Sequence, residues 1–114
     1  MQTLNPRTIE TKIPLQTKML FLFLFAESRG AANRIRIMSA LRKKPRNRNQ
    51  LSKELGMDYK HIQYHLKVLE KNNLVTQISD KRSSLFFLST LYEANEAVFD
   101  EIIIKLKKRR SNQV

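Results

Sequence analysis

Two short amphipathic segments follow each other closely in the middle of the chain, at residues 51–55 and 59–72. In the first, Leu51 and Leu55 lie one helical turn apart, and Gly56 follows them, where a left-handed residue ends a helix at least cost. In the second, the apolar residues have the i, i+4, i+7 spacing of one buried stripe: Ile62, Leu66 and Leu69. The pattern predicts two helices joined by a tight turn.

The second helix has a polar face without acids. Asp58 precedes it and can cap its first turn through the exposed amides. The residues pointing away from the apolar stripe, or flanking it, are Lys60, His61, Gln63, Tyr64 and Lys67. Such side chains suit phosphates and base edges, whereas an ordinary solvated face mixes both signs of charge. We therefore expect this face to contact the major groove of DNA; the alternative is a solvated face on a core helix.

The most apolar stretch lies near the N-terminus. We expect residues 1–12 to form a flexible basic arm and residues 13–28 to form an apolar helix, with Pro14 in its first turn. Seven consecutive apolar residues at 19–25 give no amphipathic face, so the helix must be covered on every side. We expect a second subunit to supply part of that cover. A peripheral membrane anchor is the alternative, although the run is too short to span a bilayer.

A basic region precedes the two central helices. Residues 29–48 contain eight cations and no acid, and they include a helix predicted from Ala31 to about Lys43 that Pro45 ends. Asn47 or Asn49 can cap the next helix. Because cations beside a helix-turn-helix suit the sugar-phosphate backbone, we expect DNA contacts from the residues around this cap: Arg46, Arg48, Asn49 and Gln50.

Two β-rich runs, 74–79 and 84–89, flank a polar turn and predict a hairpin. Lys81 and Arg82 lie at its tip, from which they could contact a phosphate or the minor groove. Residues 91–110 then return to helical spacing with a wide apolar stripe that is expected to face inward: Leu91, Ala94, Val98, Phe99, Ile102, Ile103 and Leu106. We expect this last helix to support dimerisation, the alternative being that it folds back on its own domain.

Composition narrows the possible functions. The chain has 114 residues, a net charge of +12 and no Cys, so disulfides and thiol chemistry are excluded and an anionic partner is indicated. His61 and His65 are four residues apart, but no third metal ligand is evident, so we expect His65 to be a structural histidine and no metal to bind. The sequence shows no catalytic constellation and indicates no cofactor; we expect a cytoplasmic protein that is not an enzyme.

Two segments, SRGAANRIRIMSAL (28–41) and NQLSKELGMDYKHIQYHLKVLEKNNLV (49–75), followed by the hairpin, resemble the ArsR-type winged helix-turn-helix repressors. The strongest local match is QYHLKVL (63–69) against the family's Ser-His-His-Leu-Lys-x-Leu, and the pattern at 58–66 is similar to an archaeal branch. The resemblance implies a homodimer whose N- and C-terminal helices pair between subunits. It also implies base-facing roles for Lys60, His61, Gln63 and Tyr64. The metal-sensing clusters of many members do not transfer, because this chain lacks Cys.

The expected fold is mainly α with a small β-hairpin wing (α+β), in which residues 29–90 form a winged helix-turn-helix between dimerisation helices at 13–28 and 91–110. The expected function is that of a homodimeric, repressor-like transcription regulator bound to double-stranded DNA and associated with the nucleoid. Two alternatives remain. One is an architectural nucleic-acid binder of low specificity, and the other is a winged helix used for protein contacts.

Overall fold

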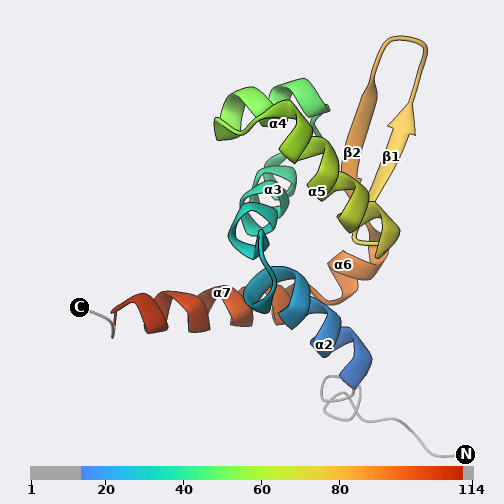
Figure 1. Ribbon diagram of the computed structural model, residues 1–114. Helices are drawn as coiled ribbons and strands as arrows, with labels where there is room; N and C mark the ends of the chain where they lie inside the picture. The colour runs from blue at the N-terminus through green and yellow to red at the C-terminus, as the bar shows by residue number, and fades with distance from the viewer. Residues whose placement is uncertain (1–13, 112–114) are drawn as a thin grey trace, which may run out of the picture.

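The computed structural model describes residues 14–111, so the predicted arm at 1–12 lies outside the described residues. Figure 1 shows a helical body with one hairpin projecting from it. The helical segments are α2 (Leu15–Leu22), the π-helical turn η1 (Phe23–Glu27), α3 (Ala31–Lys43), α4 (Arg48–Leu55), α5 (Tyr59–Lys71), α6 (Thr90–Ala94) and α7 (Glu96–Ser111). The strands are β1 (Val75–Ser79) and β2 (Ser84–Leu88). The predicted fold class, mainly α with an antiparallel hairpin wing, is confirmed.

Local chemistry defines the limits of α4 and α5. Asn47 begins α4 with a capping box, in which its side chain accepts from the Gln50 amide at 2.8 Å and the Gln50 side chain accepts from the Asn47 amide at 2.9 Å. Gly56 ends α4 in the left-handed conformation (φ 60°), as predicted. Asp58 occupies the N-cap of α5, but its side chain makes no capping hydrogen bond there, which corrects the predicted cap.

The hairpin is a regular antiparallel pair. Val75 lies opposite Leu88, and the register continues to Ser79 opposite Ser84. Asn73, with φ 62°, supplies the left-handed residue between α5 and β1. Arg46 adds a single bridge to Phe86, and this bridge fixes the hairpin to the segment between α3 and α4. The wing is therefore attached at its base and projects at its tip (Figure 1).

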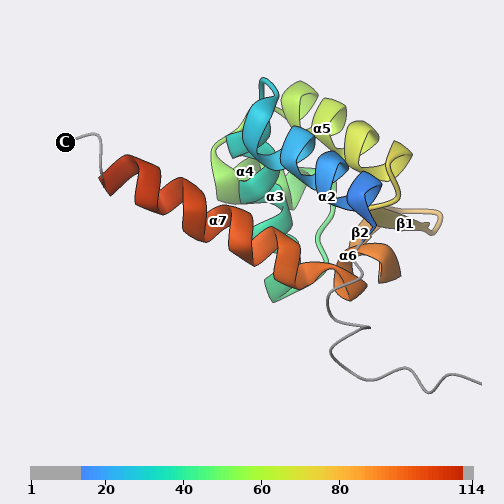
Figure 2. The same cartoon turned by 90° about the horizontal axis from the view of Figure 1, so that it is seen from below.

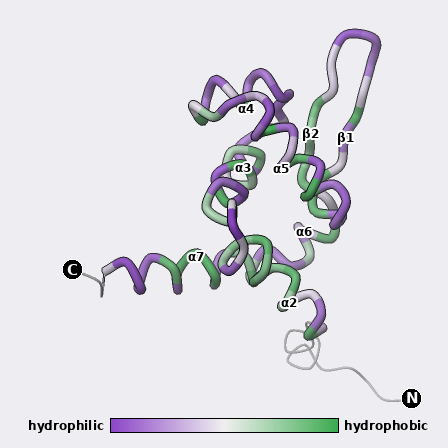
Figure 3. The backbone as a smooth tube through the Cα atoms, in the orientation of Figure 1, coloured by the Kyte–Doolittle hydropathy of each residue, from purple (hydrophilic) through white to green (hydrophobic). Residues whose placement is uncertain are grey.

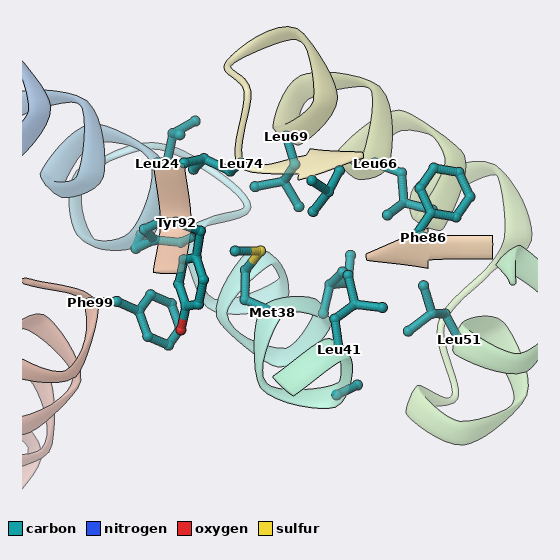
Figure 4. Close-up of a cluster of buried hydrophobic side chains, with 14 of the residues drawn as sticks. Leu24, Met38, Leu41, Leu51, Leu66, Leu69, Leu74, Phe86, Tyr92 and Phe99 are labelled. Carbon is teal, nitrogen blue, oxygen red and sulfur yellow. The ribbon is translucent and has the colours of Figure 1, made fainter. Parts of the chain in front are cut away.

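One continuous hydrophobic core joins the helix-turn-helix to the terminal helices. Figure 4 shows Leu51 and Phe86 at one end of the cluster, Met38 in its middle, and Tyr92 with Phe99 at the other end. The aromatic end is organised by edge-to-face contacts, with Phe99 centred 5.0 Å from Phe25 and 5.4 Å from Tyr92. The helix-turn-helix and the terminal helices thus share the same interior.

The N-terminal apolar helix is covered on one side only. Phe21, Leu24 and Phe25 are fully buried, whereas Met19 is 59% exposed and Phe23 is 55% exposed. In Figure 3 the hydrophobic colour continues along α2 and into the nearer part of α7. No helix among residues 14–111 is both long enough and apolar enough to cross a membrane.

The C-terminal region differs from the single helix predicted from Leu91. The chain forms α6, breaks at Asn95 and then forms α7. Leu91, predicted to face inward, is exposed, and Tyr92 is buried in its place because Ser89 caps α6 and turns that side toward the core. The first turns of α7 pack on α2 and η1, and the rest of the helix extends beyond the body of the molecule (Figure 2).

Candidate nucleic-acid interface

The outer face of α5 is open to solvent. Its apolar stripe is buried in the core, and it contains Ile62, Leu66 and Leu69. The five residues predicted to face DNA from this helix are all exposed: Lys60, His61, Gln63, Tyr64 and Lys67. Tyr64 is 59% exposed, a large value for an aromatic side chain in the middle of a helix. The helix therefore combines a fixed inner side with a cationic outer side.

The orientation of α5 is set by contacts at the preceding turn. Ser52 donates from its hydroxyl to the Met57 carbonyl at 2.6 Å, and Met57 itself is buried. Arg36 donates to the Leu55 carbonyl at the C-terminus of α4, where helix carbonyls lack partners of their own. These bonds tie α3, α4 and the turn together, so the outer face of α5 is held at a defined angle to the body.

The turn at the wing tip is closed by hydrogen bonds to Asp80. The Asp80 carboxylate accepts hydrogen bonds from the backbone amides of Arg82 at 2.7 Å and Ser83 at 2.9 Å, and these bonds lower the pKa of Asp80. The Asp80 carboxylate is thus hydrogen-bonded within the turn. The Lys81 and Arg82 side chains are exposed. In Figure 1 the hairpin tip and α4 lie toward the same end of the molecule, whereas α7 and α2 lie toward the opposite end.

Arg46 does not belong to this surface, which corrects the prediction from the basic run. The residue is 6% exposed, and its guanidinium is bonded within the fold. It pairs with Glu54, and it donates to the Ala40 carbonyl and, at 2.8 Å, to the Lys44 carbonyl. Position 46 joins α3, α4 and β2, so a long cation at this place connects the three elements instead of reaching solvent.

The neighbouring residues at the start of α4 are at least partly exposed to solvent. The Arg48 guanidinium lies over the Phe86 ring at 4.9 Å, and the side chain is half-buried. Asn49 is exposed, and Gln50 is exposed although its carbonyl oxygen serves the capping box. Tyr59, the first residue of α5, is 41% exposed and was missed by the sequence argument, which began at Lys60. The feature of the sequence that could have identified Tyr59 is an aromatic residue directly after the turn at 56–58.

The prediction that His65 is a structural histidine is confirmed. It is buried, and its Nδ1 lies 3.3 Å from Nη1 of Arg34, which is also buried. Because a guanidinium can only donate, Nδ1 accepts and the proton of the neutral ring lies on Nε2. Burial, and then the charges of Arg34 and His61, lower the pKa of His65. Within residues 14–111, no cluster of three or more His, Asp or Glu side chains could hold a metal ion.

Helices α3, α4 and α5 with the hairpin define a winged helix-turn-helix protein. In the DNA-binding members of this fold class, the helix at the position of α5 enters the major groove. Residues 32–77 match the family model described as bacterial regulatory protein, arsR family. The resemblance is therefore confirmed over this segment: residues 32–77 are similar to the helix-turn-helix of the ArsR family.

Solved structures share the fold at low sequence identity. The transcriptional regulator BldR of Sulfolobus solfataricus is 17% identical with a TM-score of 0.64, over 95% of this chain and 81% of that one. YodB of B. subtilis is 20% identical with a TM-score of 0.64, over 85% and 95% of the two chains. Mb0332 of Mycobacterium bovis, described as a homodimeric DNA-binding domain and a possible ArsR-family regulator, is 14% identical with a TM-score of 0.60, over 99% and 94%. No curated protein matches the chain.

Proposed function

We propose that the protein is a homodimeric, repressor-like transcription regulator that inserts α5 into the major groove of DNA. The observation that carries this proposal is the exposed outer face of α5, where cations and hydrogen-bonding side chains occur without a carboxylate from Tyr59 to Leu69. An α-helix fits the major groove in width. A regulator bound in this way acts where the DNA is, in the cytoplasm and on the nucleoid, and needs no catalytic residue or cofactor.

Each exposed side chain has a role that follows from its chemistry. Gln63 can form a bidentate pair with adenine, and Lys60 can pair with guanine or a phosphate. Tyr64 and His61 can contact either bases or phosphates, and Lys67 suits the backbone. The remaining predicted contacts serve the backbone and the minor groove from α4 and the wing: Arg48, Asn49, Gln50, Lys81 and Arg82. Arg46 is excluded because its guanidinium is already bonded within the fold.

The proposed dimer uses α2 and the exposed part of α7, that is, the dimerisation segments 13–28 and 91–110 on either side of the DNA-binding segment 29–90. Leu15, Met19 and Ile104 are more than half exposed, and such large apolar side chains on terminal helices favour a protein partner. The solved Mb0332 domain, which shares the fold, is described as homodimeric. A two-fold dimer would place two copies of α5 on half-sites about one helical turn apart. The bound dimer would then block other proteins from that DNA.

Selection of binding sites from random duplex DNA, together with the mass of the complex, tests the proposal directly. We expect a two-fold sequence with half-sites centred roughly 10 base pairs apart, bound by two chains. A preference for a single unrepeated site bound by one chain would contradict the dimer, and failure to bind any duplex at low salt would contradict the function and favour a winged helix that contacts proteins.

A second candidate function is low-specificity coating of DNA. It is favoured by the exposed cations at the end of α7, far from α5 in Figure 1: Lys105, Lys107, Lys108, Arg109 and Arg110. Titration of the selected site and of random duplex at several salt concentrations separates the two functions. The architectural function is ruled out if the selected site binds roughly a thousandfold more tightly or better.

Replacement of Gln63 by Ala tests the assignment within α5. We expect the variant to lose discrimination at one base pair per half-site, by about 1–3 kcal/mol, because a bidentate contact to adenine is removed. Repeating the selection with the variant measures this loss. Thr76→Ala, an exposed change on β1, is the control and should leave the selected sequence as it is. An unchanged preference in the Gln63 variant would remove this residue from the proposed site.

A further inference from the structure

A hollow of about 370 Å³ lies between the segment from η1 to the first half of α3, on one side, and the C-terminal half of α5, on the other. Its polar wall includes Arg29 and Arg34 on one side and Lys71 on the other. Its apolar wall includes Phe23 and Val68, with the exposed ring of Tyr64 beside them. The volume is within the usual range of small-ligand pockets, and the combination of an apolar wall with a few polar groups is typical of them.

The charge of this hollow is not balanced. Three cations line it, and no carboxylate does so among the residues that the structure describes. Arg34 is buried, yet none of the ion pairs within residues 14–111 includes it. A buried cation without a counter-charge is costly, and neutral hydrogen-bond acceptors offset only part of that cost. An anion in the hollow would supply the missing negative charge.

One of the three cations, Arg34, is held in place by the fold. Arg34 donates to the Leu24 carbonyl at 2.8 Å, to the Arg29 carbonyl at 3.2 Å, to the Ser28 hydroxyl and to His65. Gly30 fits closely against this group, because a Cβ at position 30 would lie 2.6 Å from Cε1 of His65. The guanidinium is thus held in one place before any ligand arrives, which reduces the entropy lost on binding.

We propose that this hollow binds a small aromatic monocarboxylate as a regulatory ligand. The carboxylate pairs with Arg29 and Lys71 in the field of Arg34, and the ring lies against Phe23 and Val68. A DNA phosphate is a less suitable occupant for two reasons. The wall is partly apolar, and the hollow lies at the C-terminal half of α5, whereas recognition helices contact bases from their N-terminal part.

The ligand and DNA share a residue. Tyr64 lines the hollow and also belongs to the proposed DNA-contacting face, and the wall opposite α5 comes from η1, the turn that follows it and α3. A bound anion therefore covers the Tyr64 side chain. It also adds negative charge beside α5, the helix that must approach the DNA phosphates. Binding of the ligand lowers the affinity for DNA, and DNA lowers the affinity for the ligand by the same factor. This coupling rests on the proposed function, but the binding of the ligand does not.

Calorimetric titration of the full chain with benzoate, in the absence of DNA, tests the site. We expect benzoate to bind, whereas benzamide, acetate and inorganic phosphate bind at least tenfold more weakly, because each lacks the charge or the ring. The double variant Arg29→Ala with Lys71→Ala should weaken benzoate binding roughly tenfold or more, since two charge-assisted contacts are lost. Lys43→Ala, an exposed cation at the end of α3 and outside the hollow, should bind benzoate like the wild type.

Equal binding of benzamide, tighter binding of phosphate than of benzoate, or unchanged binding in the double variant would overturn the proposal. Tight phosphate binding would identify the hollow as a contact for the DNA backbone. A second titration measures DNA affinity with and without benzoate, where we expect a loss in the wild type and none in the double variant. If benzoate binds but no duplex does, the site stands and only the proposed DNA function fails.

Discussion

Helices α5 and α7 both combine apolar and cationic residues, yet they leave different surfaces exposed. The apolar stripe of α5 is wholly buried, and its exposed side is polar. In α7, Val98, Phe99 and Ile102 are buried, but Ile104 beyond them is 54% exposed. The outer face of α5 is polar, so it is stable in contact with water, and its cations suit an anionic partner. The exposed part of α7 instead presents Ile104 among lysines and arginines, an apolar side chain that the proposed dimer would cover.

The difference shows that total charge is a poor measure of a DNA-binding surface. Arg34 and Arg46 are buried and bonded inside the domain, and Arg42 pairs with Asp100 at 2.7 Å and stacks over Phe99. These cations support the interior and the base of α7. In the proposed function, the exposed cations of α5 and the wing are among those that contact phosphates.

The largest effect is expected from charges placed on the apolar surface of the terminal helices. The double variant Met19→Glu with Ile104→Glu should convert the dimer to monomers, because each change buries a charge in the interface. Loss of the second half-site contact should then weaken binding to a two-fold DNA site by at least about a hundredfold. Analytical ultracentrifugation and DNA titration measure both changes. Lys43→Glu, at an exposed position at the end of α3 and outside α2 and α7, is the control, and a wild-type protein that is already monomeric would contradict the dimer.

A smaller effect, on stability, is expected at Arg46. Removing this side chain breaks its pair with Glu54 and leaves the Ala40 and Lys44 carbonyls without their donor. Arg46→Ala should lower the free energy of unfolding by about 2–3 kcal/mol, which urea denaturation measures. Lys44→Ala, an exposed neighbour, should change it by less than about 0.5 kcal/mol. If both variants were equally stable, the buried cation would not be structural.

Lys67 should contribute through charge alone. Lys67→Ala is expected to reduce the slope of log K against log salt by about 0.9, the value for one phosphate contact, and to weaken all duplexes alike. Fluorescence anisotropy at several salt concentrations measures the slope. Lys107→Ala, at the far end of α7, is the matched control and should leave the slope unchanged. Equal effects from the two variants would favour the diffuse, architectural mode of binding.

The smallest effect concerns His65 and pH. Burial next to Arg34 and His61 lowers the pKa of His65 in the folded protein, so the folded state takes up a proton less readily than the unfolded chain. The neutral ring of His65 therefore stabilises the folded protein at pH values above about 6.5, the pKa of the unfolded chain. This stabilisation is lost as the pH falls through the lower pKa of the folded protein. Urea unfolding at pH 8 and pH 5.5 should show a larger loss in the wild type than in His65→Gln.

His61→Gln is the control for this measurement, since His61 is exposed and makes no hydrogen bond among the described residues. It should show a loss of stability close to that of the wild type. An equal loss in His65→Gln and in the wild type would mean that His65 does not contribute to the pH dependence.

Periodicity was sufficient for most of the local structure. The spacing of Leu51 and Leu55 before Gly56 predicted the first central helix and its end, and the stripe beginning at Ile62 predicted which side of α5 is buried. Both follow from contacts within one or two turns. Arg46 and Leu91 were assigned wrongly for the opposite reason. Their environments depend on residues far away in sequence, such as Ala40 and Glu54 for Arg46 and the core around Tyr92 for α6.

The sequence by itself determined the order of the elements up to the hairpin, the acid-free outer face of α5 and the position of the basic hairpin tip, because backbone geometry and residue chemistry fix these locally. Only the tertiary structure decided which cations are free and which are buried. It also decided that α2 is covered on one side and that Arg34 faces His65 beside a cationic hollow. A charge is cheap in water and costly in a core, and its location is known only once the surrounding helices are in place.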